Sequence, residues 1–345
     1  MTILRLLGFA SALVLALAGP PAVARDTGDA TGRILAVPDT VARVFAAGPP
    51  AGLILYSLAP DRLLGWPRPL APESLALLPA DAAKPAYGRL TGKGDEANLE
   101  TILKLKPDLI VDVGSIGPTY VSLATRVQEQ TGVPVLLFDG RLDALAATYR
   151  RLGGILGLAA EAEIRAAWIE SRLARVRDRL RDLPPERRPR VYFARGPEGL
   201  ETARAGSINV EAIDYAGGRN VAGEALGGGS LVTVSLEQVL AFDPDIIIAM
   251  EPAFHAALNG DPLWRQLRAV GVGRAVLAPQ SPFPWVDYPP SVNRVLGVLW
   301  LAALFHPDLF PEDLRAEVRD FHRLFYHRTP SETELDALLA AAAWP

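Results

Sequence analysis

One short stretch occurs twice in the chain, and it limits the possible folds more than any other feature. The copies cover residues 98–111 and 235–248. Each begins with a residue that suits a helix N-cap, Asn98 or Ser235, and continues with apolar residues at helical spacing. Each then reaches a Pro-Asp pair, which ends the helix because proline disfavours helical backbone in the residue before it. The branched apolar residues that follow are typical of a strand buried on both faces of a parallel sheet. The duplication therefore predicts two α/β lobes.

The N-terminus has the pattern of a secretory signal peptide. Arg5 supplies a positive charge, residues 6–17 are apolar, and prolines precede a small-x-small site at Ala22–Ala24. The apolar run is too short to span a bilayer comfortably, although an uncleaved membrane anchor is the alternative. We expect cleavage after Ala24 and an exported, periplasmic protein.

Composition excludes several classes of function. A formal net charge of −4 argues against a nucleic-acid partner, which usually requires a basic excess. The absence of cysteine excludes disulfides, thiolate metal sites and iron–sulfur clusters. The four histidines include His322 and His327, whose spacing is poor for binding one metal ion. We therefore expect neither a catalytic site nor a protein-borne metal site.

The segment between the two repeats predicts a helical connection. Residues 143–157 and 160–183 both have helical spacing, and the second helix would be ~36 Å long. It could bridge the lobes, or it could be an ordinary surface helix of one domain. The predicted division is a signal peptide (1–24), an N-terminal lobe (25–142), connecting helices (143–183) and a C-terminal lobe with terminal helices (184–345). The predicted fold class is α/β, with two Rossmann-like three-layer lobes joined by a single long helix and a ligand cleft between them.

Candidate binding residues lie in loops that follow the predicted strands, because open parallel sheets bind ligands at the carboxyl ends of their strands. Arginine and lysine suit an anionic ligand, and aromatic rings suit a bulky one. The alternative for each residue is that it only stabilises its own loop. The candidates from the N-terminal lobe are Arg89, Lys93 and Ser115. The candidates from the C-terminal lobe are Arg195, Glu201, Ser207, His255, Trp285 and Tyr288.

These features together resemble the periplasmic substrate-binding proteins of iron-complex ABC importers, which include receptors for ferric siderophores, haem and cobalamin. The likeness rests on Leu-Lys-Pro-Asp-Leu-Ile-Val at 105–111 and Gly-Gly-Arg-Asn-Val-Ala at 217–222, and it covers residues 33–325. The resemblance implies a receptor without a cofactor, which captures a metal chelate and delivers it to an ABC permease dimer. It also implies that Glu100 and Glu237, one on each lobe, dock onto arginines of that permease.

Several alternatives remain open at this point. Residues 195–209 are similar to a subgroup whose relatives take nickel or other metals as small chelates, so the ligand could also be such a chelate, haem or cobalamin. A sensor subunit or a chelate-handling enzyme would share the fold, although the lack of cysteine and of paired histidines and carboxylates counts against an enzyme. We expect a monomer whose lobes close only modestly, because one rigid helix bends less than several flexible strands.

Overall fold

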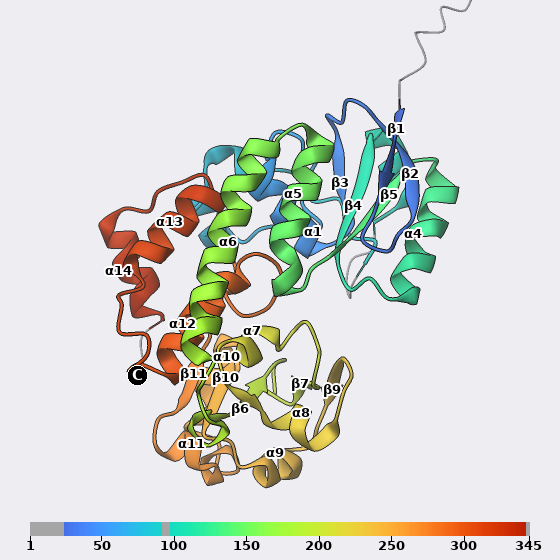
Figure 1. Ribbon diagram of the computed structural model, residues 1–345. Coiled ribbons are helices and arrows are strands. Elements are labelled where there is room, and N and C mark those ends of the chain that lie inside the picture. The colour runs from blue at the N-terminus through green and yellow to red at the C-terminus, as the bar shows by residue number, and fades with distance from the viewer. Residues whose placement is uncertain (1–23, 92–96, 343–345) are drawn as a thin grey trace, which may run out of the picture.

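The two predicted α/β lobes are present in the structure, a computed structural model that describes residues 24–91 and 97–342. Figure 1 shows the sheet of the N-terminal lobe above that of the C-terminal lobe, with the C-terminal helices to one side. In the described part of the chain, no helix is both long and apolar enough to cross a bilayer.

The N-terminal lobe is built on a parallel sheet of β3 (Val44–Ala46), β4 (Leu109–Gly114) and β5 (Val135–Asp139), in that order. A single parallel bridge from Leu63 to Val44 extends it. Its helices are α1 (Pro49–Leu58), α2 (Pro72–Ala76), α3 (Leu99–Leu105), α4 (Pro118–Thr131) and α5 (Leu145–Leu156).

The polar composition of residues 25–32 is typical of a loose segment, but these residues form the first strand and the turn of an antiparallel hairpin. Strand β1 (Ala24–Gly28) pairs with β2 (Ile34–Pro38). The buried carboxylate of Asp29 explains the order: it accepts hydrogen bonds from Thr31 N at 2.9 Å and from Leu137 N in β5 at 3.3 Å. A polar turn that satisfies a neighbouring strand's backbone is ordered in spite of its composition.

The C-terminal lobe is built on a four-stranded parallel sheet in the order β11-β10-β6-β8. These strands are β6 (Arg190–Ala194), β8 (Arg219–Asn220), β10 (Ile246–Ala249) and β11 (Ala275–Leu277). A small antiparallel sheet of β7 (Glu201–Ala203) and β9 (Leu231–Thr233) was not predicted from the sequence. The helices of this lobe are α7 (Glu211–Tyr215), α8 (Val221–Leu226), α9 (Leu236–Phe242), α10 (Pro252–Leu258) and α11 (Arg268–Gly271).

The repeated stretches have the predicted structure. Asn98 caps α3 by accepting a hydrogen bond from Glu100 N at 2.8 Å, and Ser235 forms a capping box with Gln238 at the start of α9. Both helices end in a left-handed residue directly before the proline, Lys106 (φ 46°) and Asp243 (φ 41°).

The aspartate after each proline performs the same task in both lobes. Asp108 accepts hydrogen bonds from the backbone N–H groups of Ala42 and Arg43, and Asp245 accepts one from the backbone of Arg190. The side chains of these two arginines then donate to the last carbonyl groups of α3 and α9. Each repeat therefore fixes its helix against the start of the neighbouring strand, which explains why the pattern recurs.

Alternating side chains of each sheet enter different hydrophobic clusters. Ile246 and Ile248 of β10 face a large cluster shared by both lobes, whereas Ile247 and Ala249 face a separate cluster of the C-terminal lobe. Ile110 of β4 likewise faces a smaller cluster of the N-terminal lobe. Both faces of both sheets are therefore covered, which makes each lobe a three-layer structure.

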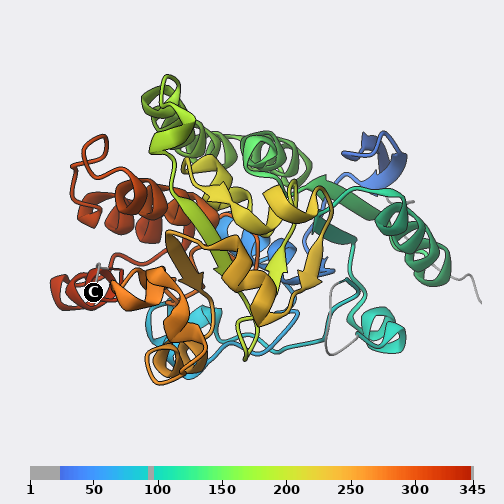
Figure 2. The same cartoon turned by 90° about the horizontal axis from the view of Figure 1, so that it is seen from below.

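The 22-residue helix α6 (Ala159–Leu180) connects the lobes and packs against α5 and against α12 (Arg294–Phe305). In Figure 1 it runs alongside both lobes. It is not the only link between them, because the C-terminal helices return to the N-terminal lobe. Helix α13 (Arg315–Phe325) packs against α1, and α14 (Glu332–Ala340) packs against α13. Figure 2 shows these red helices on the side of the molecule opposite the blue β1-β2 hairpin.

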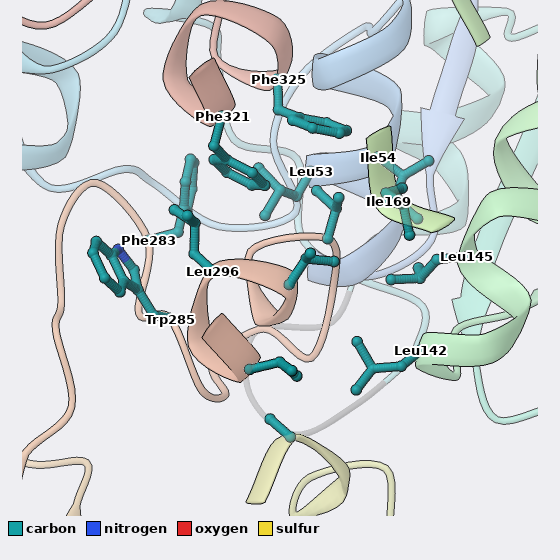
Figure 3. Packing of buried hydrophobic residues seen from close by; sticks show 14 of the residues in the cluster. Leu53, Ile54, Leu142, Leu145, Ile169, Phe283, Trp285, Leu296, Phe321 and Phe325 are labelled. Carbon is teal, nitrogen blue, oxygen red and sulfur yellow. The ribbon is translucent and has the colours of Figure 1, made fainter. Parts of the chain in front are cut away.

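The large shared cluster lies where these helices meet. Figure 3 shows its aromatic part, in which Phe321 and Phe325 of α13 lie near Leu53 and Ile54 of α1. Polar contacts also connect α1 with the end of α13. The Tyr56 hydroxyl donates a hydrogen bond to the carbonyl of Tyr326, and the His327 ring contacts the carbonyl of Tyr56 at 2.9 Å. The lobes are thus held by a common core as well as by α6.

Candidate functional site

A cavity of about 540 Å³ lies between the lobes, at the carboxyl ends of β3, β4 and β6. Such a volume is typical of a small-molecule site, and the position is where open parallel sheets bind ligands. The N-terminal lobe contributes residues from 49 to 120, the C-terminal lobe contributes residues from 195 to 231, and a loop over residues 287–290 closes one side.

The C-terminal wall contains an arginine whose charge is already compensated. Arg195 is only 3% exposed. Its Nε lies 2.9 Å from Asp287 Oδ2, and its Nη1 lies 3.1 Å from Glu201 Oε2. Asn209 donates hydrogen bonds to both oxygens of Asp287, at 3.0 and 3.1 Å. Burial raises the pKa of Asp287, and the neighbouring Arg195 opposes that shift. Arg195 therefore organises this wall more than it offers free charge to a ligand.

Tyr288 presents an aromatic ring to the cavity under constraint from both lobes. The Arg195 guanidinium lies over its ring at 4.4 Å, and Arg68 of the N-terminal lobe donates to its carbonyl at 3.1 Å. Its backbone is left-handed (φ 58°), a conformation that is costly for a residue with a bulky side chain. Such strain, held by surrounding contacts, is typical of ligand-binding positions.

The N-terminal wall contains two arginines, Arg68 and Arg89, that form no ion pair among the described residues. They are close enough to influence each other: burial lowers the pKa of Arg68, and the charge of Arg89 lowers it further. Two neighbouring cations without a carboxylate partner favour an anionic ligand, which would neutralise both.

A buried carboxylate, Asp112, lies at the end of β4 and also lines the cavity. Thr91 donates a hydrogen bond to its Oδ1 at 3.1 Å. Burial raises the pKa of Asp112 to about 6, while the hydrogen bonds from Thr91 and from the Val113 backbone act in the opposite direction.

Two proline pairs form a rigid part of the wall. Pro49 and Pro50 begin α1, and Pro289 and Pro290 follow Tyr288; Ser291 Oγ joins the two pairs by donating to the Pro50 carbonyl at 3.0 Å. Proline has no N–H, so the first turn of α1 offers an anion fewer backbone donors than most helices do. Arg68 and Arg89 are therefore the main candidates for recognising an anion at this site.

The structure brings five of the nine predicted binding residues to the cavity: Arg89, Ser115, Arg195, Glu201 and Tyr288. Lys93 lies outside the described residues. The cavity also contains Arg68, Thr91, Asp112, Tyr120 and Asn209, which the sequence analysis missed. Asp112 had a visible signal, since it is a carboxylate inside an otherwise apolar strand, whereas Arg68 lies in a proline-rich segment without a regular pattern.

Ser207, His255 and Trp285 do not line the cavity. Ser207 is buried in a turn, where its hydroxyl accepts a hydrogen bond from Asn209 N at 3.3 Å. His255 lies on α10 with its Nε2 3.0 Å from the Ala275 carbonyl. Trp285 is fully buried in the shared core, near Phe283 in Figure 3, because its large apolar ring is better accommodated there than at a wet surface.

Within residues 24–91 and 97–342, no three histidine, aspartate or glutamate side chains are grouped closely enough to hold a metal ion. The arrangement of cations, aromatic rings and buried carboxylates in the cavity suits the capture of a ligand.

The two glutamates of the repeats, Glu100 and Glu237, are exposed in the first turns of α3 and α9. Glu100 forms an exposed ion pair with Lys104 at 2.8 Å. A hydrogen bond from Ser235 lowers the pKa of Glu237. Both carboxylates therefore occupy equivalent points of the duplicated unit and are accessible to a partner.

Comparison with known proteins agrees with this geometry. A family model described as periplasmic binding protein matches residues 61–282. An ABC transporter solute binding protein from Sulfurospirillum deleyianum superposes with a TM-score of 0.83, at 26% identity, over 92% of this chain and 99% of that one. A molybdate periplasmic binding protein from Haemophilus influenzae, solved with molybdate, superposes with a TM-score of 0.74, at 22% identity, over 89% and 99%.

A curated relative from Halobacterium salinarum, a cobalamin-binding protein, is 29% identical over 159 residues. That match covers 46% of this chain and only 41% of the relative.

Proposed function

Because this chain belongs to the periplasmic binding protein family, we propose that it is a receptor that captures an anionic metal chelate and delivers it to an ABC permease. The observation that carries the proposal is the pair of arginines, Arg68 and Arg89, that face the cavity without a described ion-pair partner. Chelators such as siderophores bind ferric iron through anionic oxygens, and the resulting complex commonly keeps a net negative charge. Arginines recognise such a charge without competing for the metal.

A compact chelate of the ferric-siderophore type agrees best with the cavity. Two tyrosines, Tyr120 and Tyr288, line it together with the rigid proline pairs. A small nickel chelate would also be accommodated. Haem or cobalamin would bring more apolar surface than these two rings can cover. The name of the Halobacterium relative nevertheless makes cobalamin the second candidate, although that relative matches only part of this chain.

Purification of the mature protein from its own periplasm, followed by native mass spectrometry and metal analysis, tests the proposal. We expect one bound chelate of defined mass. If the protein is purified free of ligand, titration with ferric siderophores, nickel–histidine, haem and cobalamin identifies the class. A bare metal ion retained at one-to-one stoichiometry after dialysis would contradict the chelate proposal.

We further propose that Glu100 and Glu237 dock onto the permease. Their exposure and their equivalent positions on the two lobes support this role. In vesicles that contain the cognate permease, Glu100→Arg and Glu237→Arg should abolish uptake while ligand affinity stays unchanged. The matched control is Asp308→Arg, a charge reversal at a side chain that is 87% exposed. Normal uptake by both glutamate variants would contradict the docking role.

The remaining parts of the proposal concern location and assembly. We propose export through a signal peptide cleaved after Ala24, and a monomer in the periplasm. N-terminal sequencing of the mature protein and light scattering test these two points: a retained leader or a stable dimer would contradict them.

A further inference from the structure

Asp112 is the one carboxylate of the cavity wall that is both buried and remote from any arginine partner among the described residues. Asp287 and Glu201 are paired with Arg195, but no described ion pair involves Asp112, which is 5% exposed. Its hydrogen bonds come from the neutral groups of Thr91 and of the Val113 backbone. A carboxylate has about four acceptor positions, so acceptor capacity is left for a bound molecule.

The surroundings of Asp112 are built for close contact. A Cβ atom at Gly48 would lie 2.5 Å from Thr91 Oγ and 3.7 Å from Asp112 Oδ1, so only glycine allows the start of α1 to approach this pair. The next two residues, Pro49 and Pro50, have no N–H to donate. Hence neither proline can satisfy the free oxygen positions of Asp112 through its backbone.

Resting on the function proposed above, we propose that Asp112 determines specificity by accepting a hydrogen bond from an N–H or O–H group of the ligand, and by rejecting oxyanions that carry only acceptors. The two ends of the site then have different requirements. Arg68 and Arg89 bind the anionic edge of the chelate, whereas Asp112 requires a donor such as an amide, an amine or a metal-bound water. An acceptor-only anion would place oxygen against oxygen at a buried site, which is repulsive.

Two probes of opposite chemistry distinguish a ligand that carries a hydrogen-bond donor from an anion that carries only acceptors. Molybdate presents only oxygen acceptors at neutral pH, whereas the nickel–histidine complex carries carboxylates together with N–H donors. Calorimetric titration of both probes at pH 7.5 should compare the wild type with Asp112→Asn, which keeps the shape and an oxygen to accept from Thr91. Asp112→Ser is a second variant, which removes the charge without adding an amide donor. Asp39→Asn, at an exposed position outside the cavity, is the matched control.

We expect Asp112→Asn to bind molybdate about tenfold more tightly than the wild type, and nickel–histidine about tenfold more weakly. Asp112→Ser should change molybdate binding in the same direction, and Asp39→Asn should change neither affinity. Unchanged or weaker molybdate binding by both Asp112 variants, or unchanged binding of nickel–histidine by Asp112→Asn, would overturn the inference alone. If neither the wild type nor any variant bound molybdate, nickel–histidine or a ferric siderophore titrated in the same way, the proposed function would fall together with it.

Discussion

Arg294 offers the sharpest test of how the two lobes are held together. Its side chain is fully buried, and its Nη1 donates to the Ile208 carbonyl and to Glu211 Oε2, both at 2.8 Å. Its Nη2 donates to the carbonyl of Gly140, which directly follows β5 of the other lobe. Glu211 also accepts a hydrogen bond from Leu142 N at 3.1 Å. One buried ion pair therefore joins the backbone of both lobes behind the cavity.

Replacing this arginine by methionine keeps much of the volume but leaves Glu211 without its cation. Loss of one partner from a buried ion pair costs ~3–5 kcal/mol. We expect the lower end, about 3 kcal/mol, because the Glu211 side chain is 16% exposed and keeps its bond from Leu142. Arg294→Met/Glu211→Gln should recover part of the loss, since the unpaired charge is then removed.

Equilibrium unfolding in urea, followed by tryptophan fluorescence and circular dichroism, measures these differences. The matched control is Arg150→Met. Arg150 also pairs with two glutamates, but the pairs are exposed, so its loss should cost less than ~1 kcal/mol. A loss for Arg294→Met as small as that of the control would refute the reasoning that burial makes this pair essential.

Three further predictions concern pH, backbone strain and lobe movement. Burial lowers the pKa of His322 from 6.5 to about 3, so between these pH values the unfolded state binds more protons than the folded state. The free energy of unfolding should therefore fall as the pH drops from 6.5 to 3, by at most about 1.4 kcal/mol per pH unit. Urea titrations at several pH values should show a shallower acid limb for His322→Phe; an identical limb would contradict this. Lys106→Gly should stabilise the protein by about 1 kcal/mol, because glycine adopts the left-handed backbone of this position without strain. Lys104→Gly, inside α3, should destabilise it by about 1 kcal/mol. If both variants were less stable than the wild type, strain at Lys106 would be excluded. Scattering of free and ligand-bound protein should give nearly equal radii of gyration, because closure is limited by the shared core, and a large decrease would show that the core does not limit it.

The parts of the fold that could be predicted are those in which local chemistry and burial agree. The repeats were recognisable because N-caps, Pro-Asp ends and branched strands all lie within one short window. The β1-β2 hairpin was not, since the order of its turn depends on Asp29 bonding to a strand more than one hundred residues away. Short helices α8 and α10 were missed because neither begins with a side-chain N-cap of the kind that marks α3 and α9.

In the candidate site, too, local sequence predicted some features and long-range packing decided others. Arg89, Ser115, Arg195, Glu201 and Tyr288 come from loops that follow strands, and all five line the cavity. Trp285 was placed in the cavity because aromatic residues in such loops often contact ligands, but its loop folds inward and its ring fills the core. Sequence spacing gives the position of a loop and not the direction of its side chains, which long-range packing decides.

The return of the C-terminal helices to the N-terminal lobe also has a consequence for the order of folding. Tyr56 and Tyr326, which are hydrogen-bonded, are 270 positions apart, and Phe321 and Phe325 belong to the same core cluster as α1. The first lobe therefore cannot complete its core until almost the whole chain is available. Domains that fold during synthesis usually do so from the N-terminus onward, whereas the first lobe of this chain needs its C-terminal helices. For a chain exported through a signal peptide, as proposed above, we expect this dependence to delay folding of the leading half until the last helices are present.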